Sequence, residues 1–134
     1  MRQVLLPLAV LAVLAASALT PGSVRSAEAP AELGTDLMQA IDDANKSLSS
    51  NIALKDARAS ASDARDINQD FIQVEAYFAA RPDAHDAVDL ARKTRELTDL
   101  IVQSVGSGNF DAAADSATAL SRTCRTCHTF YKKS

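Results

Sequence analysis

The sequence predicts an all-α fold, an antiparallel up-down-up-down four-helix bundle. The chain of 134 residues is 47% hydrophobic but only 4% aromatic, and its 4 glycines and 4 prolines favour helices over a β-sandwich with many turns. Apolar residues recur at spacings of three and four in four stretches joined by short connections, as in a bundle. No stretch shows the strict apolar–polar alternation of a half-buried strand. The net charge of −3 argues against a nucleic-acid partner.

A secretory signal peptide is predicted at the N-terminus. Arg2 precedes an apolar run from Val4 to Ala16, interrupted only by proline, and small residues follow the run. These features are typical of a secretory signal, and the run is shorter than the about 20 residues of a membrane-spanning helix. We therefore assign residues 1–27 to the signal, with cleavage expected between positions 18 and 29, and residues 28–134 to one helical domain. Export places the protein outside the cytoplasm, most simply in a bacterial periplasm, with no membrane span after signal removal.

The first two helices are predicted over about 32–50 and about 54–80. On the first, one apolar stripe contains Leu33, Leu37, Ile41, Ala44 and Leu48. On the second, one face contains Ala57, Ala61, Ala64, Ile67, Phe71, Val74 and Phe78. Between the two helices, Ser49-Ser50-Asn51 is polar but lacks glycine and proline, so a loop and a kink are both compatible with the sequence.

Two further helices follow the sequence Arg81-Pro82-Asp83. Proline ends the second helix there, and Asp83 is expected to cap the third, with Asp86 adding negative charge to its first turn. Gly106-Ser107-Gly108-Asn109 ends the third helix and supplies an N-cap for the fourth. The fourth helix has a heptad-like seam of Phe110, Ala113, Ala117, Leu120, Cys124, Cys127 and Tyr131. Both cysteines are therefore expected to face the interior.

The two cysteines belong to the sequence CRTCH at 124–128, which is the C-x-x-C-H attachment signature of c-type haem. The thiols of Cys124 and Cys127 are spaced to form thioether bonds to the two haem vinyl groups, and His128 directly after them is placed to ligate the iron. A disulfide, a redox pair and a zinc site fit the two cysteines less well. A disulfide closes too small a loop to stabilise much, and a thioredoxin-like pair needs a βαβ context. A zinc site lacks ligands, because His85 is the only other histidine.

The ending CRTCHTFYK at 124–132 resembles the C-(K/R)-x-C-H-x-x-(F/Y)-(R/K) pattern of the class II c-type cytochromes. The resemblance implies a periplasmic bundle of the cytochrome c′ type, with one covalent haem c near the C-terminus of the fourth helix and a distal residue from the first. Members with a distal methionine are low-spin electron carriers, whereas members with an open site bind small gases. Larger members have a long connection where this chain turns tightly at 81–83, so both monomer and homodimer stay open.

Met38 is the candidate sixth ligand of the iron, because it is the only methionine left after signal removal. In an up-down-up-down bundle the C-terminus of the fourth helix lies beside the N-terminus of the first. Met38 lies roughly 9 Å into the first helix, and residues 124–128 lie roughly 6 to 12 Å from the end of the fourth, so their levels match. The alternatives are an open site covered by Leu37 and ligation by His85 at the start of the third helix.

Other residues are expected to support the haem. Phe78, with Phe71 and Tyr77, is expected to pack against the porphyrin edge. Arg125, or Arg122 one turn earlier, is expected to pair with a propionate. The sequence shows no Ser-His-Asp set and no phosphate-binding glycine loop, so we expect no enzyme activity. The predicted function is transfer of single electrons between redox protein partners, and the alternative is binding of NO or CO at an open iron site.

Overall fold

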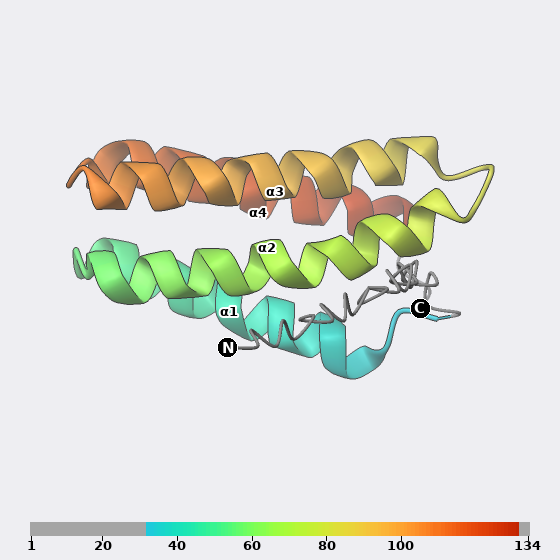
Figure 1. The fold of residues 1–134 in the computed structure, drawn as a ribbon, viewed down its shortest axis with the longest axis horizontal. Helices are drawn as coiled ribbons and strands as arrows, with labels where there is room; N and C mark the ends of the chain where they lie inside the picture. Colours follow the sequence, from blue (N-terminus) through green and yellow to red (C-terminus); the bar gives the residue numbers. More distant parts are fainter. Residues whose placement is uncertain (1–31, 132–134) are drawn as a thin grey trace, which may run out of the picture.

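The computed structural model describes residues 32–131, so the predicted signal peptide at 1–27 lies outside the described residues. The described chain forms four α-helices: α1 (Thr35–Ala53), α2 (Ala57–Ala79), α3 (His85–Gly106) and α4 (Phe110–Tyr131) (Figure 1). Within this part of the chain, none of the helices has both the length and the apolar character that crossing a membrane requires. The prediction of an all-α, four-helix domain is confirmed.

The helices form an up-and-down bundle in which each helix packs against its neighbours in the chain and α1 also packs against α4. The turns at 54–56 and 107–109 lie at the same end of the bundle, which we call the closed end (Figure 1). The α2–α3 turn at 80–84, the start of α1 and the end of α4 lie at the opposite end, which we call the open end (Figure 1).

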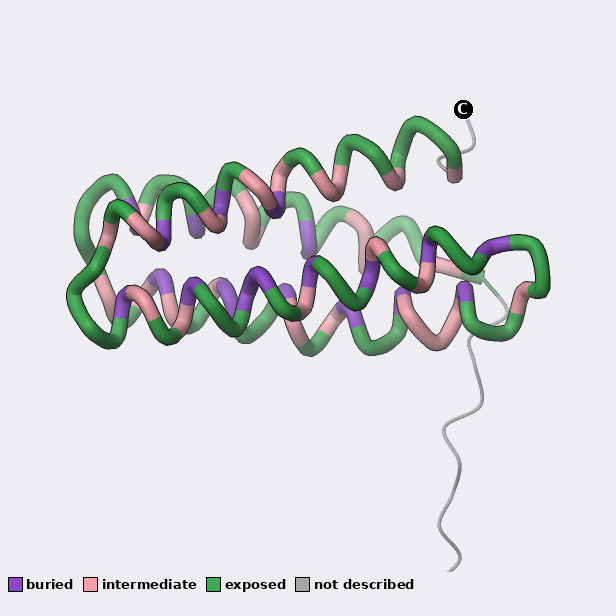
Figure 2. The backbone as a smooth tube through the Cα atoms, turned by 90° about the horizontal axis from the view of Figure 1, so that it is seen from above, coloured by how far each residue is buried: buried purple, intermediate pink, exposed green. Residues whose placement is uncertain are grey.

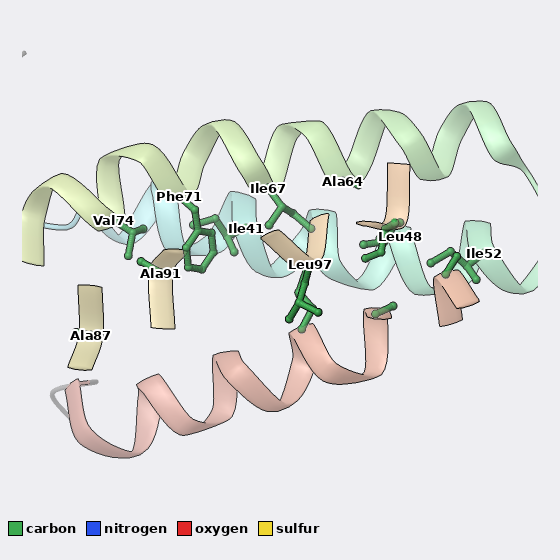
Figure 3. Close-up of a cluster of buried hydrophobic side chains, with 14 of the residues drawn as sticks. Ile41, Leu48, Ile52, Ala64, Ile67, Phe71, Val74, Ala87, Ala91 and Leu97 are labelled. Atoms are coloured by element: carbon green, nitrogen blue, oxygen red, sulfur yellow. The ribbon is translucent and has the colours of Figure 1, made fainter. Parts of the chain in front are cut away.

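The core runs along the bundle axis, and part of it is shown in Figure 3. Each helix contributes one large side chain with no exposed surface, namely Leu48, Ile67, Ile101 and Leu120. Burying such a side chain contributes about 1.5–3 kcal/mol to folding. Much of the remaining core is made of small residues, among them Ala64, Ala87, Ala91, Ala113 and Ala117. The predicted apolar stripes therefore face the core, although alanine makes each stripe small.

A polar contact fixes α2 against α3 outside the core. The amide nitrogen Nδ2 of Asn68 donates to the carbonyl oxygen of Arg95 at 3.1 Å, to Oγ1 of Thr98 at 2.8 Å and to Oδ1 of Asp99 at 3.1 Å. Arg95 in turn donates from Nη1 to Oε2 of Glu75 at 2.9 Å. These partly buried bonds set the register between the two helices.

Both turns at the closed end are Schellman motifs. Lys55 and Gly108 occupy the left-handed position of their motifs, with φ of 57° and 75°. In the first motif the amide of Lys55 donates to the carbonyl of Ile52 at 3.0 Å, and the amide of Asp56 donates to the carbonyl of Asn51 at 2.9 Å. The bonds of the second motif follow the same pattern. The α1–α2 connection is therefore a compact turn.

The first two helices are joined by a turn, as in the loop alternative, but the turn lies at 54–56 and not at 49–51. Residues 49–51 are neither a loop nor a kink, because α1 continues through them to Ala53. Asn51 is held within the helix by its Nδ2 donating to Oδ2 of Asp63 on α2 at 2.7 Å. The second helix begins at Ala57, three residues later than predicted, and Asp56 caps it by accepting from the amide of Ala59 at 2.9 Å.

The two predicted caps of the later helices have opposite outcomes. Asn109 caps α4, since its Oδ1 accepts from the amide of Ala112 at 3.1 Å, and that prediction is confirmed. The prediction that Asp83 caps α3 is wrong. The turn closes one residue later, where the amide of Ala84 donates to the carbonyl of Arg81 at 3.3 Å, so Ala84 occupies the N-cap position without a side-chain bond.

Candidate functional site

The outer half of α4, residues 121–131, differs in burial from the inner half. Ala113, Ala117 and Leu120 of the seam are buried, as predicted. Cys124, Cys127 and Tyr131 continue the same seam but are only half-buried, and no residue of α4 from 121 to 131 is buried (Figure 2). The apolar side of α4 therefore continues toward the open end, past the point where the core ends.

A cavity of about 1260 Å³ lies at the open end between the helices. Ordinary small-molecule sites measure roughly 300–1,000 Å³, so the space is large enough for a bulky cofactor. Its wall is mixed. The apolar part of the lining includes Ile41, Phe71, Val74, Phe78 and Leu90. All four helices and the α2–α3 turn contribute to it.

Four of the residues selected from the sequence line this one cavity: Cys124, Cys127, His128 and Met38. The first three come from α4 and Met38 comes from the start of α1. Met38 is half-buried, whereas the imidazole of His128 is exposed at the rim. Leu37, the neighbour of Met38, is half-buried but is not part of the lining. The cavity therefore brings two thiols, an imidazole and a thioether together.

The two thiols are held in a low-polarity environment. Burial raises the pKa of Cys124 to about 11 from 9.0, and the neighbouring Cys127 thiol adds to the rise. Burial also raises the pKa of Cys127, with the Asp86 carboxylate adding to it. Both cysteines are free and neutral at ordinary pH. They are not the low-pKa thiols of a redox-active pair.

An aromatic wall closes one side of the cavity. The ring of Phe78, which is buried, lies 5.0 Å from the ring of Tyr77 and 5.0 Å from that of Tyr131. The guanidinium of Arg81 lies 3.3 Å from the centre of the Tyr77 ring, and its Nη1 donates to the Tyr77 carbonyl at 2.6 Å. The Tyr131 hydroxyl donates to Oδ1 of Asp86 on α3.

Three residues of the sequence interpretation lie elsewhere. Arg125 is exposed and lines a separate groove of about 340 Å³ between α1 and α4, because a residue directly after a seam position is turned about 100° around the helix. Arg122 is also exposed and lies outside the cavity lining. His85 is exposed at the first position of α3 and lies outside the lining as well.

Sequence reasoning missed Arg81 and Asp86 as parts of the site. The sequence indicates only a helix end at Arg81, yet this residue lines the cavity beside Tyr77. It indicates only a helix-terminal charge at Asp86, yet this residue accepts the Tyr131 hydroxyl. The signal that would have found both is topological. The end of the second helix and the start of the third lie at the same end of the bundle as the haem motif.

These residues fit a haem better than a bare metal ion. Within residues 32–131, no three His, Cys, Asp or Glu side chains come together as a metal ion requires. A covalent haem needs instead two thiols, one or two axial donors and an apolar space, and the cavity supplies all of these. In the same wall, Oδ1 of Asn45 is buried and has no hydrogen-bond partner among the described residues, as in a site completed by a bound group.

Comparison of the chain with protein-family models, with curated proteins and with solved structures finds no significant match.

Proposed function

We propose that this protein is a periplasmic class II c-type cytochrome that carries single electrons between redox protein partners. The observation that supports the proposal most strongly is the shared cavity at the open end. Cys124, Cys127, His128 and Met38 come from opposite ends of the sequence, and all four line it. Nothing in a purely structural bundle requires these four side chains to line one large cavity.

Each of these residues has a distinct role in the proposal. The sulfur atoms of Cys124 and Cys127 would hold the cofactor through thioether bonds, and His128 and Met38 would be the ligands of its iron. When bound, the haem would supply an iron that takes up and returns one electron. The two proposed ligands lie on separate regular helices, α4 and α1, which would keep them in place when the iron changes its oxidation state. The buried ring of Phe78 would form part of the apolar surface against which the haem packs.

A gas-binding function is the second candidate. Ile41 is buried, lies one helical turn from Met38 and lines the same cavity. If this apolar side chain covered the distal side and Met38 did not ligate, the sixth position would be open to NO or CO. The two candidates use the same attachment residues and differ only at the distal position.

The visible spectrum of the holoprotein, produced with its signal in a strain competent in cytochrome maturation, separates the two. We expect sharp α and β bands on reduction, the weak long-wavelength band of methionine ligation when oxidised, and no change under CO. A broad high-spin spectrum that CO converts would support gas binding instead. A product without haem would overturn both candidates.

Localisation in the periplasm depends on the predicted signal and is tested separately. We expect N-terminal sequencing of the exported protein to begin between residues 19 and 30. Recovery of the intact N-terminus in the cytoplasmic fraction would contradict this part of the proposal.

A further inference from the structure

We infer that Tyr131 is a positioning residue, whose contacts with Asp86 and Phe78 hold the last turn of α4 in place and thereby fix His128. The inference rests on the proposed function, because it assigns a role toward the iron ligand. It concerns a residue outside the CRTCH sequence, four positions after Cys127, that acts through the helix.

The outer half of α4 packs against the core only through half-buried side chains, Cys124 and Cys127 among them. Its residues are at most half-buried from position 121 to position 131, whereas the inner half is anchored by Leu120 in the core. The threonine hydroxyls of this half do not reach other helices. Those of Thr123, Thr126 and Thr129 donate to carbonyls four residues earlier in α4. A helix end with this pattern needs a separate anchor to keep one position.

Tyr131 provides that anchor through two different contacts. Its hydroxyl donates to Oδ1 of Asp86 in the first turn of α3, across the open end of the bundle. Its ring packs against the buried Phe78 of α2 at a centroid distance of 5.0 Å and an interplanar angle of 60°. The bond to the carboxylate also raises the pKa of Tyr131 to about 12, so the hydroxyl keeps its proton. Tyr131 thus connects α4 to both α2 and α3.

His128 lies one turn before Tyr131 on the same helix, and Cys127 lies four residues before it. Residues three and four apart are neighbours on a helix surface and move together as one rigid turn. His128 is exposed, and its imidazole makes no hydrogen bond to another residue in the described part of the chain. Its orientation toward the cavity therefore depends on the placement of the turn that contains it.

The test uses the holoprotein and three variants. Tyr131→Phe keeps the ring contact with Phe78 and removes only the hydroxyl. Asp86→Asn keeps an oxygen acceptor and removes the charge. Asn68→Ala is the matched control, because it removes the α2–α3 hydrogen bonds and lowers stability at a residue outside both the cavity lining and α4. Amide hydrogen exchange over residues 121–131 and the electron paramagnetic resonance spectrum of the oxidised iron are measured for each.

We expect Tyr131→Phe to exchange roughly tenfold or more faster than the native protein in residues 121–131, the effect of one lost hydrogen bond to a charged group. We also expect its resonance lines to shift or broaden, because the imidazole is no longer held at one angle. Asp86→Asn should give a smaller change of both. Asn68→Ala should leave both unchanged.

The inference is wrong if Tyr131→Phe matches the native protein in both measurements, or if Asn68→Ala changes them equally. A native protein that holds haem through His128 while Tyr131→Phe has no effect would overturn this inference and leave the proposed function standing. A native protein without haem would overturn both.

Discussion

Met38 and Leu37 are adjacent on α1, yet only Met38 lines the cavity. The difference gives a matched pair of variants. We predict that Met38→Leu, which keeps the apolar bulk and removes the sulfur donor, converts the oxidised iron to high spin and allows the reduced protein to bind CO. Leu37→Ala should leave the spectrum unchanged. A Met38→Leu protein that stays low-spin would show that another residue provides the sixth ligand.

The thiol of Cys124 gives a prediction on the haem-free chain. Since burial raises its pKa to about 11 from 9.0, the thiolate fraction at pH 8 falls about a hundredfold, and iodoacetamide should react more slowly by the same factor. Peptide mapping measures the rate of modification at Cys124 alone, because trypsin cleaves after Arg125 and separates the two cysteines. The chain unfolded in urea is the control. Equal rates in the folded and unfolded chain would show that the seam is not packed.

The raised pKa of Cys124 also predicts how the stability of the haem-free chain depends on pH. A thiol whose pKa is higher in the folded chain than in the unfolded one disfavours folding once it ionises. The contribution of the neutral Cys124 thiol to the free energy of unfolding is therefore fully present below pH 9.0 and is lost as the pH rises toward about 11. Thioether formation removes the titrating group, so the holoprotein should not show this loss.

At the scale of elements, the two Schellman turns of the closed end differ in one residue. Lys55 adopts a positive φ at the position where Gly108 stands in the other turn. Because a side chain in the left-handed region costs about 1 kcal/mol, Lys55→Gly should raise the free energy of unfolding in urea by about that amount. Lys55→Ala, which keeps the β-carbon, should change it little. A Lys55→Gly protein no more stable than Lys55→Ala would contradict the argument.

Gly108→Ala is the reciprocal change. Nothing lies within 4 Å of a β-carbon added there, so any cost comes from the backbone angle alone. We predict a loss of about 1 kcal/mol in the free energy of unfolding, measured by urea titration. An unchanged urea midpoint would show that this turn tolerates a side chain without strain.

Comparison of the predicted with the observed helices shows which features of the fold could be predicted from the sequence. Helical periodicity predicted four helices and the seam of α4, because spacings of three and four leave few alternatives. It missed the α1–α2 boundary, since Ser49-Ser50-Asn51 resembles a loop in composition while Asn51 is held by Asp63 on another helix. It missed the Ala84 cap, since the closing bond of the turn involves only backbone. A local sequence pattern does not predict contacts between residues that lie far apart in the chain.

The same distinction applies to the site. The spacing of Cys124, Cys127 and His128 is local and was visible in the sequence. The selection of Met38 required the topology, and the cavity lining agrees with it. Arg125 lies outside the cavity lining, because adjacency to a motif does not place a side chain on the same face of the helix.

At the scale of the whole molecule, the cofactor would complete the core. Small alanines fill much of the interior, and the cavity occupies the open end. We predict that Cys124→Ala/Cys127→Ala does not retain haem on a denaturing gel and melts earlier and less cooperatively than the holoprotein. Arg125→Ala is the control, because it lies between the cysteines but outside the cavity. A sharp, native-like melt of the double variant would contradict the prediction.

The connections of the bundle also bear on how firmly its two ends are held. Two turns join helices at the closed end, whereas at the open end only α2 and α3 are joined by a turn (Figure 1). Within residues 32–131, the outer half of α4 is therefore held at the open end by side-chain contacts alone, among them those of Tyr131 with Phe78 and Asp86. Segments with few buried contacts open locally at a lower free energy than the core. We therefore expect the outer half of α4 to open more often than the rest of the bundle, which would expose Cys124 and Cys127 to solution while the other helices stay folded.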